Sequence, residues 1–403
     1  MNALTSIAPA PIVGKPDTFR ISPFQSDLLD LSRWVAAFLV VIEHLRSFMF
    51  VSHRSEDHFG LFWKAFYFLT GFGHSAVMVF FVMSGFLVGG KVLERLANGN
   101  FSWRKYAVDR TSRLYAVYVM ALLLGAAFDY VGYHYMNRFG LYDRSFPGTI
   151  AVVNHDFHAN LKPSIFGLNL AMCQTILGPV FGSNGPLWSL ANEFWYYLAG
   201  PLLFALFFAR TWGTALLGIG ALAALFCFLP AAILLYFPVW LLGAALCFVN
   251  TRPLLPLWFA LLLFLVSFSA ARLQWLKVPY IADMLIGISF ALVVNSAAGS
   301  PRRFPWHTLS RKAADFSYSV YLCHVPFLVF ALSALYQATG RGLQEPRTIP
   351  FISLFLLMLL LAYAWCYIVS LATERQTGRI RKRLHGLSGR EAVSQLDTVQ
   401  QSR

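Results

Sequence analysis

Long apolar runs, broken by short polar segments, follow one another along nearly the whole chain. Residues 215–236 and 349–372 contain no ionised side chain. Each run is long enough to cross the hydrocarbon core of a bilayer, which takes about 20 residues of helix. The pattern predicts an all-α, polytopic integral membrane helical bundle with about ten transmembrane helices. The predicted spans are residues 31–50, 72–90, 111–131, 187–208, 212–229, 231–249, 254–271, 279–298, 317–336 and 349–371.

The distribution of Lys and Arg predicts the orientation. If both termini are cytoplasmic, the inner segments hold more than twice as many Lys and Arg as the outer segments, as the positive-inside rule requires. The chain then divides into a cytoplasmic N-terminal tail (1–27) without a signal-peptide pattern, a membrane domain (28–373) and a basic cytoplasmic tail (374–403). The longest connection is 132–186. Its part from 165 to 181 is apolar but broken by glycine and proline, which predicts a re-entrant or interfacial element.

Composition agrees with a membrane protein and limits the function classes. Of the 403 residues 58% are hydrophobic and 12% are charged, with a net charge of +14. Orientation and attraction to anionic lipid account for this charge, so we predict no nucleic-acid partner. The five cysteines show no paired spacing, which argues against disulfides and a zinc site. His155, Asp156 and His158 form only a weak ligand pattern, and we predict no metal.

The first span carries ionisable side chains in the stretch RWVAAFLVVIEH. Arg33 and His44 are eleven residues apart, so they share a helix face and lie about 16 Å apart along the axis. Ionisable groups at membrane depth commonly mark a functional path. Alternatively, Asp30 pairs with Arg33, while Glu43, His44 and Arg46 mark the outer end of the span. We favour this alternative for Glu43 and Arg46, which point away from the shared face, and keep both interpretations for His44.

The stretch LDLSRWVAAFLVVIEHL resembles the first helix of the membrane-bound acyltransferase-3 family, whose signature is a basic residue, ten intervening residues and a histidine. VFFVMSGFLVGG, RTSRLY, GPLWSLANEFWYY and SYSVYLCHVPF match further family motifs in the same order, from about residue 30 to 371. The resemblance implies about ten helices and transfer of an acyl group, most often acetyl, to a carbohydrate or another small hydroxyl acceptor. Leu31 and Ala116 replace a glycine and a proline common in the family, which affects local shape.

Transfer from a thioester to an alcohol needs a base, oxyanion stabilisation and a carrier site. The resemblance implies acetyl-coenzyme A as the donor, and Arg33, Arg110 and Arg113 are expected to hold its phosphates; plain positive-inside charge is the alternative. His44 is expected to be the base. Glu193 is its expected acidic partner, or else an acid that stabilises a helix N-terminus.

Other motif residues are expected to line the carrier channel or to contact the acceptor. Ser84, Tyr318, Tyr321 and His324 are the predicted channel residues; His324 could also donate to the thioester carbonyl, and helix packing is the favoured alternative for the others. Trp188, Trp195 and Tyr196 are predicted to contact a sugar, with an interfacial aromatic belt as the alternative.

These observations predict a multi-pass O-acyltransferase of the bacterial inner membrane. Its partners are acyl-coenzyme A, the lipid bilayer and a glycan acceptor, such as an exopolysaccharide or its lipid-linked precursor. A transporter or flippase, which also uses intramembrane His, Arg and Glu, is the main alternative. A glycan polymerase or ligase is a second one. Acyl transfer that depends on a thioester donor would distinguish the enzyme from both the transporter and the polymerase or ligase.

Overall fold

The described part of the protein is helical. The computed structural model describes residues 19–50, 60–143, 157–250, 252–340 and 349–386. Within these ranges the chain forms helices and turns without a β-strand, and one isolated bridge joins Gln174 and Gly178. The all-α prediction is confirmed. Residues 1–18 of the predicted N-terminal tail and residues 387–403 of the predicted C-terminal tail lie outside the described residues.

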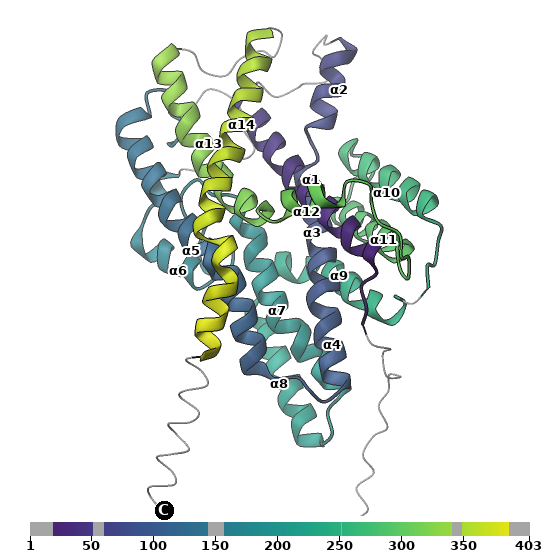
Figure 1. Cartoon of the computed structure of the whole chain (residues 1–403). Helices are drawn as coiled ribbons and strands as arrows, with labels where there is room; N and C mark the ends of the chain where they lie inside the picture. The colour runs from purple at the N-terminus through teal and green to yellow at the C-terminus, as the bar shows by residue number, and fades with distance from the viewer. Residues whose placement is uncertain (1–18, 51–59, 144–156, 251, 341–348, 387–403) are drawn as a thin grey trace, which may run out of the picture. The chain divides into compact units, whose positions relative to one another are not determined.

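The helices follow the predicted apolar runs in order (Figure 1). The α-helices are α1 (Pro23–Met49), α2 (Leu61–Leu69), α3 (Gly73–Ser84), α4 (Gly90–Ala97), α5 (Trp103–Met136), α6 (Pro163–Leu170), α7 (Leu187–Phe207), α8 (Trp212–Phe228), α9 (Ala231–Ala245), α10 (Leu257–Arg272), α11 (Pro279–Ser296), α12 (His307–Ala314), α13 (Ser317–Thr339) and α14 (Ile349–Ala372). A π-helical turn, η1 (Gly85–Gly89), joins α3 to α4. Short 3-10 turns are η2 (His158–Asn160), η3 (Leu246–Phe248) and η4 (Glu374–Gln376).

Several helices are suited to a bilayer by length and composition. Within the described residues, 6 helical segments are long and apolar enough to cross one: Leu61–Ala97, Trp103–Met136, Ala231–Phe248, Pro279–Ser296, Ser317–Thr339 and Phe351–Gly386. α8 and α10 are apolar but shorter. α1, with 27 residues, is long enough but more polar, and α7, with 21 residues, is also long enough to cross a bilayer although it is outside these six. The helical membrane bundle is confirmed, while ten spans and cytoplasmic termini stay predictions.

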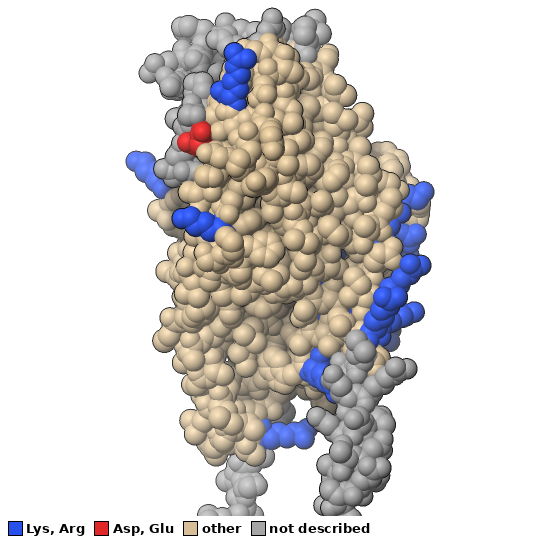
Figure 2. Space-filling model, turned by 90° about the vertical axis from the view of Figure 1, so that its left-hand side faces the viewer, with Lys and Arg blue, Asp and Glu red and all other residues tan. Residues whose placement is uncertain are grey.

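The surface agrees with contact to lipid. Leu217 of α8 is 76% exposed and Leu360 of α14 is 66% exposed. Figure 2 shows one broad face on which uncharged atoms predominate, while Lys and Arg side chains lie mainly near its margins. Exposed apolar side chains on such helices are typical of contact with a membrane or a partner protein.

Helix starts differ from the predicted span starts where polar residues continue a helix beyond the apolar run. α5 begins at Trp103 rather than at residue 111, because the Ser102 hydroxyl accepts a hydrogen bond from the backbone N–H of Lys105 and caps the helix. Arg110 and Arg113 therefore both lie within α5, one turn apart, as predicted for the third span. α1 likewise begins at Pro23 rather than at residue 31.

The chain forms two compact units, which we describe separately. Unit 1 comprises the residues up to Ala36, His74–Phe101 and Ser189–Arg311. In unit 1, α9 packs against η1 and α11, and α10 packs against α11.

Two glycines bring α9 and η1 into backbone contact. A Cβ atom at Gly85 would lie 1.8 Å from the carbonyl oxygen of Trp240, and a Cβ atom at Gly243 would lie 2.0 Å from that of Val82. Neither position has room for a side chain. The close helix packing expected at the Ser-Gly-Phe motif is therefore present at Gly85.

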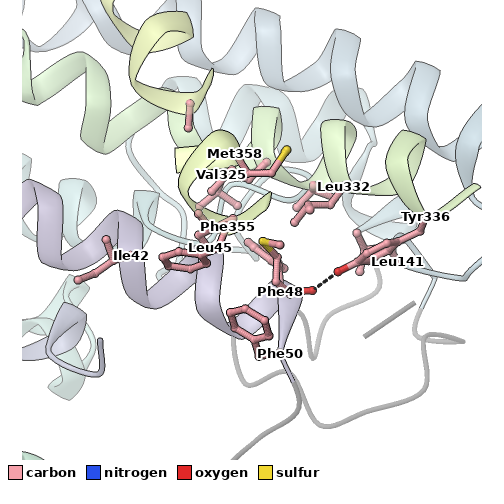
Figure 3. Packing of buried hydrophobic residues seen from close by; sticks show 14 of the residues in the cluster. Ile42, Leu45, Phe48, Phe50, Leu141, Val325, Leu332, Tyr336, Phe355 and Met358 are labelled. Carbon is pink, nitrogen blue, oxygen red and sulfur yellow. Dashed lines mark hydrogen bonds between the residues drawn. The ribbon is translucent and has the colours of Figure 1, made fainter. Parts of the chain in front are cut away.

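Unit 2 comprises Ala37–Gly73, Ser102–Trp188 and the residues from Lys312 onward. In unit 2, α13 packs against α5 and α14. Its apolar core combines the end of α1 with α13 and α14, and the Tyr336 hydroxyl donates to the carbonyl oxygen of Phe48 at 2.8 Å (Figure 3). The core fixes the α1 segment that carries His44 against α13.

The segment between α5 and α7 turns back on itself around one buried asparagine. Asn169, at the end of the eight-residue helix α6, donates from Nδ2 to the carbonyl oxygens of Ile165 and Pro179. Its Oδ1 accepts from the backbone N–H of Phe181 at 3.0 Å. This folded segment lies where a re-entrant or interfacial element was predicted; its depth in the bilayer stays a prediction.

Candidate active site

Two histidines from distant parts of the sequence meet in unit 2. Nδ1 of His44 on α1 lies 2.8 Å from Nε2 of His324 on α13. The rings are nearly parallel, with centroids 5.1 Å apart. His324 is completely buried, whereas His44 is partly exposed. The pair thus consists of the buried His324 and the more accessible His44.

Hydrogen bonding assigns the protons of this pair. Nδ1 of His324 lies 2.7 Å from the carbonyl oxygen of Val320, which can only accept, so Nδ1 of His324 carries the hydrogen. Nε2 of neutral His324 is then an acceptor, and Nδ1 of His44 is the donor. A neutral His44 in this tautomer has its lone pair on Nε2, as a general base requires.

This assignment changes the interpretation of His324. The sequence suggested a channel residue or a donor to the thioester carbonyl. Since the N–H of neutral His324 is directed to Val320 and Nε2 faces His44, the geometry favours a role in orienting His44. A carboxylate has the corresponding position in a catalytic triad. Contact of His324 with the carrier stays a prediction.

The other ionisable residues near the end of α1 make structural contacts. Glu43 accepts from the backbone N–H of Gly73, and the guanidinium of Arg46 lies 5.4 Å from the ring centre of Tyr67. Nε of Arg46 also donates to the carbonyl oxygen of Thr70 at 3.3 Å. These contacts fix α1 to α2 and to the start of α3, which supports a structural role for Glu43 and Arg46.

A hydrogen-bonded cluster surrounds Glu193 in unit 1. The hydroxyl of Ser84, the last residue of α3, donates to Oε1 of Glu193 at 2.8 Å, and the hydroxyl of Tyr197 donates to the same oxygen. Nε1 of Trp240 donates to the Ser84 hydroxyl oxygen at 3.2 Å. η1 begins directly after Ser84, and π-helical turns inside α-helices are frequent at functional sites.

Glu193 does not stabilise a helix N-terminus. α7 begins at Leu187, so Glu193 lies beyond its first turn, which contains no acidic residue. The macrodipole acts mainly on the first turn. Within unit 1 the carboxylate is held by two hydroxyl groups. Its predicted partnership with His44, which belongs to unit 2, stays a prediction.

The predicted phosphate ligands have different surroundings. Arg33 forms the alternative ion pair, with NH1 3.5 Å from Oδ1 of Asp30. Arg110 is partly buried, its guanidinium 5.9 Å from the ring centre of Tyr106, and Arg113 is exposed one turn later on α5. Coenzyme A binding by these three arginines stays a prediction.

The tyrosines of α13 donate to backbone carbonyls. The Tyr318 hydroxyl donates to Leu114 on α5 at 3.2 Å, and the Tyr321 hydroxyl donates to Pro186 at 3.4 Å. These contacts support the packing interpretation, and a role in lining a channel stays a prediction.

Two of the three predicted sugar contacts are partly exposed. Trp188 and Trp195 are partly exposed, and Trp195 packs against Phe228 with ring centroids 5.3 Å apart. Tyr196 is 1% exposed, and its hydroxyl donates to the carbonyl oxygen of Ile233. This burial favours packing over glycan contact for Tyr196.

The described residues contain no group of three or more His, Cys, Asp and Glu side chains able to hold a metal ion. His155 and Asp156 lie outside the described residues. The described His158 stacks on the ring of Tyr133, with centroids 3.8 Å apart. The absence of a metal stays a prediction.

Sequence reasoning missed both side-chain clusters. His44 and His324 are 280 positions apart, and nothing in either motif indicates their contact. Glu193 and Tyr197 are four residues apart on one helix, a spacing that brings side chains together. That spacing could have indicated the contact between Glu193 and Tyr197. Nothing in the sequence indicated that Trp240 contacts Ser84.

Comparison with known proteins gives one match over most of the chain. The model of a family described as an acyltransferase domain, Acyl_transf_3, matches residues 27–371. An uncharacterized protein of Haemophilus influenzae is 27% identical over 132 residues, which is 33% of this chain and 49% of that protein. The aligned part thus spans about half the length of that curated relative. No solved structure matches.

Proposed function

The chain belongs to the acyltransferase-3 family, and from this premise we propose that it transfers an acetyl group from cytoplasmic acetyl-coenzyme A to a hydroxyl group of an envelope or secreted glycan. The family and the apolar helices make the protein a multi-pass membrane acyltransferase. The donor, the glycan acceptor and a bacterial inner-membrane location are our proposal. The acceptor is an exopolysaccharide or its lipid-linked precursor.

The hydrogen-bonded histidine pair is the observation that carries the proposed chemistry. Nε2 of His44 takes the proton of the acceptor hydroxyl as its oxygen attacks the thioester carbonyl carbon. The C–S bond then breaks, and the same nitrogen returns the proton to the departing thiolate. An O-acetyl ester and coenzyme A are the products.

His324 supports this cycle through the other ring nitrogen of His44. While His44 carries the extra proton, Nε2 of His324 accepts a charge-assisted hydrogen bond from its Nδ1. The contact between Nδ1 of His324 and Val320 keeps that acceptor in the required tautomer. Proton transfer therefore needs no rotation of either ring.

Further residues complete the proposed site. Arg33, Arg110 and Arg113 bind the phosphates of coenzyme A, because guanidinium groups form paired hydrogen bonds with phosphate oxygens. Glu193 is retained as the acidic catalytic residue. Its two hydroxyl donors support the role by fixing the carboxylate in one orientation.

The test is release of coenzyme A from radiolabelled acetyl-coenzyme A by detergent-purified protein, with and without an envelope-glycan extract. We expect acceptor-stimulated release, with label in the glycan, and loss of both in His44→Ala. His134→Ala is the matched control, because His134 is exposed on α5 and contacts a backbone carbonyl of its own helix. Release by His44→Ala at the wild-type rate would refute the proposed base.

A further inference from the structure

The C-terminal end of the described chain folds back onto α5 in unit 2. After η4, residues 377–386 form a helical segment. Near its end, Nε2 of His385 lies 3.0 Å from Oδ1 of Asp109 on α5. η4 also contacts α5, so the segment has two points of contact with this helix. Residues 374–386 therefore contact α5 rather than extending away from α14.

On α5, cations flank the contact on both sides. Lys105 lies four residues before Asp109 and Arg113 four residues after it, so all three share one face of the helix. Lys105 and Arg113 are exposed. Asp109 thus lies within a row of positive charges at the start of α5.

The tail presents a similar row. Arg381 and Lys382 precede His385 by four and three residues, so they share the helix face that carries the His385 contact with Asp109. Both are exposed. Arg379 and Arg383 lie about 120° and 160° away around the helix, and Arg379 donates to Gln376 within the tail.

The His385 contact therefore brings two rows of cations toward each other. Like charges at short range repel, and one carboxylate does not neutralise four cations. An anion with several negative charges between the rows would turn this repulsion into attraction, and Arg and Lys readily bind phosphate groups.

We propose that residues 377–386, held on α5 by His385, complete the binding site for the phosphate groups of coenzyme A that Arg113 begins. The nucleotide end of coenzyme A carries a diphosphate and a 3′-phosphate, which matches a site lined by cations from two helices. This inference rests on the proposed function, which supplies the donor. It assigns Arg381 and Lys382 to donor binding.

Anionic lipid headgroups offer the same phosphate chemistry, so the test separates the two sources. Full-length protein in neutral detergent, without added lipid, is titrated with coenzyme A and with adenosine 3′,5′-bisphosphate by calorimetry. Binding to phosphatidylglycerol vesicles is measured in parallel.

The test variant is Arg381→Ala with Lys382→Ala. The matched control is Arg379→Ala with Arg383→Ala, which removes the same charge from the other side of the segment. We expect the test variant to weaken coenzyme A binding about tenfold or more, and the control to remain within about twofold of wild type. His385→Ala should weaken binding in the same direction. Thermal melting in detergent identifies variants that fail to fold.

The kinetics give a second measurement. The test variant should raise the KM for acetyl-coenzyme A, while kcat at saturating donor stays close to wild type. This result would support a binding role for the tail.

Four outcomes would overturn the inference. Equal losses in the test and control variants would show an unspecific charge effect, and losses confined to the vesicle assay would assign the tail to lipid. A wild-type protein that binds no coenzyme A would refute the proposed donor as well. In contrast, tight binding by both wild type and the test variant would refute only the role of the tail.

Discussion

Replacing the buried histidine tests the proposed proton path most directly. His324→Leu removes the acceptor that faces Nδ1 of His44 at 2.8 Å but keeps an apolar side chain in the buried site. A hydrogen bond to a charged group contributes about 1.5–3 kcal/mol. Loss of this stabilisation in the transition state should lower kcat about 10- to 150-fold, since about 1.4 kcal/mol corresponds to a factor of ten.

His324→Gln is the matched variant. A glutamine side chain can place its carbonyl oxygen near the position of Nε2 and accept from His44, so kcat should stay within about tenfold of wild type. The assay is acetyl transfer at saturating acetyl-coenzyme A with a fixed glycan acceptor, on variants that elute and melt like wild type. Equal kcat values for the Leu and Gln variants would refute the orienting role. A raised KM for acetyl-coenzyme A with unchanged kcat would instead support His324 as a carrier-channel residue.

Three further predictions concern the other parts of the molecule. Arg110→Ala should weaken coenzyme A binding about tenfold without unfolding the protein, and unchanged affinity in calorimetry would remove Arg110 from the phosphate site. Glu193→Gln should lower kcat by more than it weakens coenzyme A binding, since an amide cannot supply a negative charge; wild-type turnover would leave Glu193 a structural role only. Gly243→Ala should lower the melting temperature in detergent or prevent folding, because its Cβ would lie 2.0 Å from the carbonyl oxygen of Val82. A wild-type melting temperature would contradict that packing argument.

The helices could be predicted because apolar run length largely determines whether a segment forms a membrane helix. Each predicted span has a helix at nearly the same residues. The starts of α1 and α5 were less accurate, because a capping residue such as Ser102 extends a helix beyond its apolar run. Hydropathy alone does not contain that information.

The contacts within the candidate site could only partly be predicted. A local helical spacing relates Arg33 to His44, so their shared face follows from the sequence. The partner of His44, and Ser84 beside Glu193, come from other helices, and helix periodicity does not determine which helices pack together. The backbone contact at Gly85 and Gly243 brings α9 next to η1, and only this packing explains why Trp240 reaches Ser84.

The polarity of α1 is informative because this long helix is outside the six apolar spans. A charged side chain at the centre of a membrane helix costs about 2.5–3.5 kcal/mol on insertion scales. Partners on neighbouring helices reduce that cost, yet having a partner does not by itself mark a functional residue. Arg46 and Glu43 also have partners, and their contacts connect backbone and side chains of adjacent helices. His44 differs because its hydrogen bond to His324 uses one ring nitrogen and leaves a lone pair on the other. The proton arrangement, rather than polarity alone, therefore supports the proposal that His44 is the base.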